Sequence, residues 1–173
     1  MQPPRHAGSI HGETGLDGPA LPDPITPLHS KRAVDFIIDT LMAQDDVTLV
    51  PTGPLTNVAT ALRCEPRIAS RIVEISLMGG SLTYGNSTPA AEFNIYHDPE
   101  AAHIVFTSGV PIKMVGLNLT RQASAGEAET ERIRAIGNRV SRICAELLDF
   151  YRGALKNVFG LSGGSLHDPC AVA

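Results

Sequence analysis

The sequence has no tryptophan, and its three tyrosines and five phenylalanines are scattered along 173 residues. Proteins that bind single-stranded nucleic acid stack bases on aromatic side chains, so a base-stacking surface is not expected. Basic residues are also in the minority, because 14 Lys and Arg against 18 Asp and Glu leave a net charge of -4. No run of basic residues attracts phosphate locally. The composition therefore argues against nucleic acid and anionic membranes as partners.

Cysteines are few, and long apolar runs are missing. Cys64, Cys144 and Cys170 are an odd number without paired spacing, which favours ordinary buried thiols in a reducing compartment. The N-terminal stretch MQPPRHAGSIHGETG lacks the apolar core of a signal peptide, and no segment reaches transmembrane length. We therefore expect a cytoplasmic protein. With 43% apolar and 18% charged residues, it should fold around a core.

The length is that of one domain, and we expect a single domain over residues 1–173. Residues 1–29 are rich in proline and glycine and predict an irregular arm, with Ser30 as the N-cap of the first helix. Short β-rich runs at 47–50, 72–78 and 112–116 alternate with helical patterns, and further helices are predicted at 127–136 and 139–157. This order is typical of an α/β fold with a mostly parallel sheet and flanking helices.

Polar segments follow each predicted strand. They are PTGPLTN, GGSLTYGNSTPAAEFN and NLT. Ligands of parallel sheets bind beyond the carboxyl ends of the strands, so these segments mark the expected site. Within the second segment, the amides and carboxylate of Asn86, Glu92 and Asn94 suit several sugar hydroxyls. The alternative is a solvated loop that uses its asparagines for turns.

Two histidines lie in segments with a possible chemical role. His11, in SIHGETGLDG, belongs to a glycine-rich loop with Glu13 and Asp17 that could close over a ligand, or could simply contain consecutive turns. His167 precedes Asp168-Pro169, an N-cap signature in which the aspartate caps a helix. The same carboxylate could instead bind a hard cation such as Ca²⁺, with His167 donating a proton to a leaving group.

Long segments of the chain resemble the inosine–uridine nucleoside hydrolase family. They occur in the family's order and cover almost the whole chain: HGETGLDGPALP at 11–22, LVPTGPLTNVA at 49–59, ISLMGGSLTYGNSTPAAEFNIYHDPEAAHIVF at 75–106, MVGLNLT at 114–120 and HDPCAVA at 167–173. The resemblance implies a three-layer, Rossmann-like α/β fold. It also implies calcium-assisted hydrolysis of the N-glycosidic bond of ribonucleosides, which gives ribose and free base, and a role in nucleoside salvage.

The resemblance also implies roles for individual residues. Calcium would be bound by the carboxylate of Asp168 and the backbone carbonyl of Thr52. His167 would protonate or hydrogen-bond the departing base, and His11 would lie on an active-site loop beside that base. The remaining implied residues bind ribose, either through its hydroxyls or by packing beneath the sugar: Asn86, Glu92, Asn94 and Met78.

The sequence departs from the family's pattern at both ends. It lacks the Asp-rich DxDPGxDD motif, which supplies most calcium ligands and the general base, and it stops at HDPCAVA. We therefore expect an internal fragment, truncated at both ends, of a hydrolase whose full-length form is a homo-oligomer. The calcium site would be incomplete, and the fragment would hydrolyse nucleosides poorly or not at all. The alternatives are a non-catalytic ribose- or nucleoside-binding module and an inactive remnant.

Overall fold

The computed structural model describes residues 7–161 and 163–173. Residue 162 and the first six residues of the predicted arm lie outside the described residues. The chain divides into two compact units. The described part of the first unit comprises residues 28–121 and 167–173, and that of the second comprises residues 7–27, 122–161 and 163–166. The expectation of a single domain stays a prediction.

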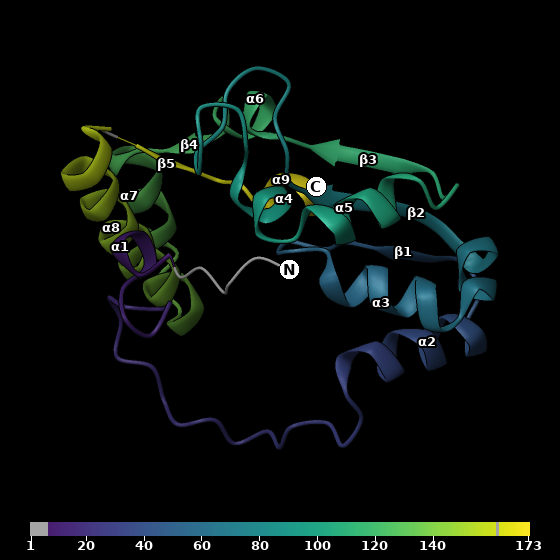
Figure 1. Ribbon diagram of the computed structural model, residues 1–173. Coiled ribbons are helices and arrows are strands. Elements are labelled where there is room, and N and C mark those ends of the chain that lie inside the picture. Colours follow the sequence, from purple (N-terminus) through teal and green to yellow (C-terminus); the bar gives the residue numbers. More distant parts are fainter. Residues whose placement is uncertain (1–6, 162) are drawn as a thin grey trace. The chain divides into compact units, whose positions relative to one another are not determined.

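The first unit contains a parallel sheet of three strands in the order β1-β2-β3 (Figure 1). The strands are β1 (Val47–Leu49), β2 (Ile72–Met78) and β3 (Ile112–Val115). The strands predicted from the β-rich runs are thus confirmed, with ends that differ by at most one residue. Gly79 and Gly80 end β2 as expected, since glycine weakens a strand.

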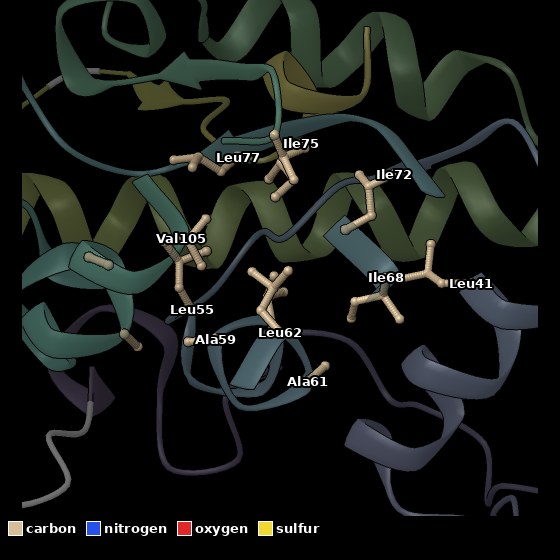
Figure 2. Packing of buried hydrophobic residues seen from close by; sticks show 14 residues of the cluster. Leu41, Leu55, Ala59, Ala61, Leu62, Ile68, Ile72, Ile75, Leu77 and Val105 are labelled. Carbon is tan, nitrogen blue, oxygen red and sulfur yellow. The ribbon is translucent and has the colours of Figure 1, made fainter. Parts of the chain in front are cut away.

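One layer of helices packs on one face of this sheet, and the main core lies between them. It contains α2 (Ala33–Ala43), α3 (Thr56–Cys64), the 3-10 helix η1 (Pro66–Arg71) and α5 (Pro99–Phe106), and α3 packs against both α2 and α5. Strands that follow one another across a sheet by right-handed crossovers place their connecting helices on the same face. Figure 2 shows the resulting apolar core, in which Ile75 and Leu77 of β2 meet Leu55 and Leu62 of the α3 region.

The start of β2 contains a register shift. Val47 pairs with Ile72, but the next residue, Thr48, pairs with Glu74. Val73 is the extra residue and is 51% exposed. Such a bulge resets the alternation of side chains, so that Ile72 joins Ile75 in the same core.

The opposite face of β2 is covered by the last helix, α9 (Pro169–Val172). The side chains of Ser76 and Met78 alternate with those of Ile75 and Leu77 and therefore face the other side of the sheet. The buried Ser76 hydroxyl donates a hydrogen bond to the carbonyl of Ala171 at 2.7 Å, and Met78 packs with Ala171 in a second apolar cluster. The order helix, sheet, helix confirms the predicted three-layer α/β class.

The structure differs from the sequence prediction at several short elements. Helix α4 (Phe93–His97) lies where a continuous loop was expected, and α6 (Leu117–Thr120) follows β3. Ser30 is not the N-cap of α2, because Arg32 occupies that position and no side chain caps the helix. Elements of four or five residues are too short to show a helical period in sequence.

The second unit is mainly helical. It contains α1 (Gly8–His11), α7 (Glu127–Ala135) and α8 (Arg139–Phe159), together with an antiparallel ladder of β4 (Ser124–Ala125) and β5 (Gly164–Ser165). The two long helices match the predicted ranges, whereas α1 lies in the arm expected to be irregular. None of the helices in the described ranges is long and apolar enough to cross a membrane.

Candidate functional site

The carboxyl ends of the three parallel strands are joined by backbone hydrogen bonds. The amide of Met78 donates to Pro51 at 3.0 Å, next to Thr52 in the segment after β1. On the other side of β2, the amide of Leu117 donates to Gly80 at 2.9 Å, which ties the segment after β3 to the glycines after β2. The polar segments predicted to share one edge of the sheet therefore do so.

Two glycines allow this close approach of backbones. Gly80 has a φ of +76°, and a Cβ there would lie 2.9 Å from the sulfur of Met114. A Cβ on Gly116 would lie 2.9 Å from the carbonyl oxygen of Gly80. The first position needs glycine for its left-handed backbone, and the second needs it for space.

Asn94 connects two of the strand ends. It is 7% exposed, and its Nδ2 donates to the carbonyl oxygen of Met78 at 2.9 Å and reaches that of Thr52 at 3.4 Å. The amide also lies 3.4 Å from the sulfur of Met78. Asn94 thus contacts two other predicted site residues.

Glu92 is 2% exposed and accepts hydrogen bonds only from backbone amides among its described contacts. Its Oε2 accepts from Gly80 at 2.9 Å and from Ile95 at 3.2 Å, and its Oε1 accepts from Asn94 at 2.9 Å. The carboxylate therefore caps the N-terminus of α4 and holds it against the end of β2. With four lone-pair sites and three donors, one acceptor position remains for a hydroxyl.

Asn86 lies in an exposed loop that its own side chain helps to close. Its Oδ1 accepts from the amide of Phe93 at 2.8 Å, and its backbone amide donates to Ala91 at 3.1 Å. Arg121 clamps the same loop, because its guanidinium lies 4.2 Å from the ring centroid of Tyr84 and donates to the carbonyl of Gly85 at 3.2 Å. Asn86 is therefore held in place from both sides of the loop.

His167 is fixed at the start of α9 by a buried threonine. The Oγ1 of Thr120 lies 2.7 Å from the Nδ1 of His167, and Thr120 is completely buried. Because α9 packs on β2 and Thr120 ends the segment after β3, His167 belongs to the same edge of the sheet. The sequence analysis did not single out Thr120; its only signal was a polar residue shortly after a predicted strand.

Asp168 is the N-cap residue of α9, with Pro169 at the first helical position as predicted, but the capping role expected of its side chain is wrong. The backbone of Asp168 is already helical, and its side chain makes no capping hydrogen bond to α9. The other Asp-Pro pair behaves as predicted, since the carboxylate of Asp98 accepts from the amide of Ala101 at 3.0 Å. A hydrogen bond from the hydroxyl of Thr56, followed by that amide, lowers the pKa of Asp98 below its ordinary value.

His11 lies in the second unit, whereas the other seven predicted site residues lie in the first. Its ring stacks on Tyr151 of α8, with centroids 5.6 Å apart and planes 7° from parallel. The loop after His11 folds around Asp17, whose carboxylate accepts from the amides of Glu13 and Thr14. A hydrogen bond from the Thr14 hydroxyl is the main cause that lowers the pKa of Asp17. An open cavity of about 220 Å³ lies between this loop and α8.

The oxygen donors expected to bind calcium agree with that ion in kind but not in number. The carbonyl of Thr52 and the carboxylate of Asp168 are hard ligands, and calcium takes six to eight of them. The described residues contain no group of three or more His, Cys, Asp or Glu side chains placed to hold a metal ion. On their own, these residues do not form a calcium site.

Comparison with known proteins identifies the family. The model of the inosine-uridine preferring nucleoside hydrolase family matches residues 1–173. The chain belongs to this family. Pyrimidine-specific ribonucleoside hydrolases RihA of Salmonella paratyphi A and Escherichia coli are 52% identical over 169 residues. This match covers 96% of the chain and 54% of each relative, so the chain spans about half the length of the curated relatives.

Solved structures support the same assignment. A purine-preferring ribonucleoside hydrolase from Gardnerella vaginalis superposes with a TM-score of 0.91 at 40% identity, covering 95% of this chain and 53% of that one. A plant nucleoside hydrolase superposes with a TM-score of 0.88 at 34% identity, covering 96% and 53%. These likenesses confirm the nucleoside hydrolase-like fold expected from the sequence.

Proposed function

We propose that this chain carries the ribose-binding and leaving-group residues of a hydrolase that cleaves the N-glycosidic bond of ribonucleosides. The observation that carries the proposal is the joining of three strand ends and α9 around Met78, Asn94 and His167 within a nucleoside hydrolase family member. Pyrimidine ribonucleosides are the proposed substrates, because the 52% identical relatives are pyrimidine-specific, whereas the purine-preferring enzyme is 40% identical.

Ribose binding follows from the chemistry of the edge. Asn86 and Asn94 offer amide groups, Glu92 keeps one acceptor position, and Met78 provides an apolar surface for the sugar ring. The side chains of Asn94 and Glu92 are already held by hydrogen bonds to backbone groups, so they lose little entropy when a sugar binds. Such preorganised polar groups favour a defined sugar orientation.

Hydrolysis breaks the bond between the anomeric carbon and the base nitrogen through an oxocarbenium-like transition state. The bonding electrons stay with the base, which takes up a proton, and the oxygen atom of water bonds to the anomeric carbon and releases one of its protons. His167 is proposed to give a proton or a hydrogen bond to the departing base, which lowers the energy of that leaving group. His11 is proposed to lie beside the base, where an imidazole can stack or donate.

Calcium assistance is a further part of the proposal. Bound calcium would supply a positive charge that lowers the pKa of a coordinated water. Thr52 and Asp168 are the donors proposed from the described residues. Two donors do not complete a calcium site. The roles proposed above for the ribose-binding residues and the histidines therefore do not depend on bound calcium.

The test is release of uracil from uridine by the purified chain, with inosine as a second substrate, in calcium and in chelator. Release that falls at least about a hundredfold in His167→Ala supports the leaving-group role. Asp168→Asn tests the carboxylate proposed to bind calcium. Asp98→Asn is its matched control, because it alters the other Asp-Pro pair, which caps α5. Faster release from inosine than from uridine would contradict the pyrimidine preference.

Binding without hydrolysis is a second candidate function. The observation that favours it is that no three His, Cys, Asp or Glu side chains among the described residues are grouped to hold a metal ion. Calorimetry distinguishes the two functions, because a binding module gives saturable heat with uridine or ribose and releases no uracil. If a folded chain gives neither heat nor uracil, the ribose-binding proposal is wrong.

A further inference from the structure

The hydroxyl of Thr120 contacts the side chain of a distant residue, as does that of Thr56, which donates to the Asp98 carboxylate. Other threonines in or at the end of helices behave differently. The hydroxyls of Thr60, Thr107 and Thr130 each donate to the backbone carbonyl four residues earlier, at 2.6, 2.7 and 2.8 Å. Threonine hydroxyls in helices commonly make this local hydrogen bond. The hydroxyl of Thr120 instead lies 2.7 Å from the Nδ1 of His167, a residue 47 positions away.

Thr120 is buried and held by its backbone, and its hydroxyl contacts His167. Thr120 is 0% exposed, and its backbone amide donates to Gly116 at 3.1 Å, so its position in α6 is fixed. Within the described ranges, the imidazole nitrogen is the one hydrogen-bond partner that the structure gives for the Thr120 hydroxyl. A hydroxyl can donate to an unprotonated Nδ1 of a neutral ring, and a buried hydroxyl proton needs such an acceptor.

We infer that Thr120 is a positioning residue that makes Nε2 the proton-donating atom of His167. This inference rests on the proposed role of His167 at the departing base. In the neutral ring, a proton donated to Nδ1 leaves the single ring proton on Nε2. The hydroxyl therefore contacts Nδ1, and Nε2 is the ring nitrogen assigned to the base.

The backbone around His167 supports a fixed ring. The carbonyl of His167 accepts from the amide of Cys170 at 3.3 Å, and the buried bond from Ser76 to Ala171 anchors α9 to β2. With the main chain held by α9 and Nδ1 held by Thr120, rotation of the imidazole is restricted. A hydrogen bond to one histidine nitrogen is the usual means by which proteins set the role of the other.

The first test is NMR of the ring nitrogens of His167 in the 173-residue chain. We expect the proton of the neutral ring on Nε2, and an Nδ1 resonance typical of a hydrogen-bonded, unprotonated nitrogen. Thr120→Val should move the Nδ1 resonance to its non-hydrogen-bonded position, and Thr120→Ser should restore it. Thr130→Val is the matched control, because Thr130 is equally buried but bonds a backbone carbonyl.

A proton on Nδ1 in the neutral wild-type ring would overturn the inference, and this measurement needs no folded variant. An Nδ1 resonance that is the same in wild type and in folded Thr120→Val would overturn it as well. Neither readout requires catalysis, so the inference can fail while the proposed function stands, and the reverse.

A kinetic comparison provides the second test. A p-nitrophenyl riboside releases a stable anion that needs no proton, whereas uracil needs assistance to leave. Thr120→Val should lower kcat for uridine by at least about tenfold while kcat for the p-nitrophenyl riboside changes less than about twofold. An equal loss with both substrates would indicate a merely structural role and would contradict the inference.

Discussion

The stability of the first unit should depend strongly on the buried carboxylate of Glu92. Glu92→Ala removes the acceptor of three backbone amides, and the bonds to Gly80 and Asn94 are buried. Hydrogen bonds to a charged group contribute roughly 1.5–3 kcal/mol each, and a buried donor left unpaired keeps its desolvation cost. Taking the lower value for the two buried bonds, we expect a loss of about 3 kcal/mol.

For a chain of this size, that loss corresponds to a fall in Tm of roughly 6–12 °C. Glu92→Gln should lie between wild type and Glu92→Ala, because one of its two terminal groups cannot accept. The assay is urea unfolding followed by circular dichroism, combined with hydrogen exchange at the amide of Gly80. Glu100→Ala, an exposed carboxylate on α5, is the control and should change the free energy of unfolding by about 0.5 kcal/mol or less. If Glu92→Ala is as stable as this control, the structural role of Glu92 is wrong.

Three further predictions concern the same unit. The hydrogen bond from Thr56 lowers the pKa of Asp98, so Asp98 should stabilise the fold above about pH 4 and lose that contribution as the pH falls through its folded pKa. Asp98→Asn should therefore reduce the acid-induced loss of stability. Acid titrations of wild type and variant that superpose would contradict this. Gly80→Ala should cost about 1–2 kcal/mol in urea unfolding because of its left-handed backbone, and an unchanged midpoint would refute the requirement for glycine. Arg121→Ala removes the cation–π contact with Tyr84 and should raise KM for uridine more than it lowers kcat, whereas an unchanged KM would separate this loop from substrate binding.

The strands were predictable because their signals are local. The apolar run of β2 is followed by Gly79 and Gly80, and the structure reproduces the predicted bounds from Ile72 to Met78. The clustering of the strand ends also followed from sequence, since parallel strands direct their carboxyl ends to one edge of a sheet.

The contacts that organise the site could not be predicted, because they join distant segments. Ser76 and Ala171 are 95 residues apart, and Thr120 and His167 are 47 apart, with no periodic pattern to connect them. The side-chain capping bond expected of Asp168 was mispredicted for a related reason. Its Asp-Pro dipeptide is the same as that at Asp98, yet only the latter accepts from its helix, so local sequence does not distinguish the two.

The central claim is that ribose binds at the joined carboxyl ends of β1, β2 and β3. The most direct measurement is an NMR titration of the purified chain with uridine, and then with ribose alone. The account predicts saturable shifts at the side-chain amides of Asn86 and Asn94 with both ligands, and their loss in Asn94→Ala. Saturable shifts confined to α7 and α8, with no change at either asparagine amide, would contradict it.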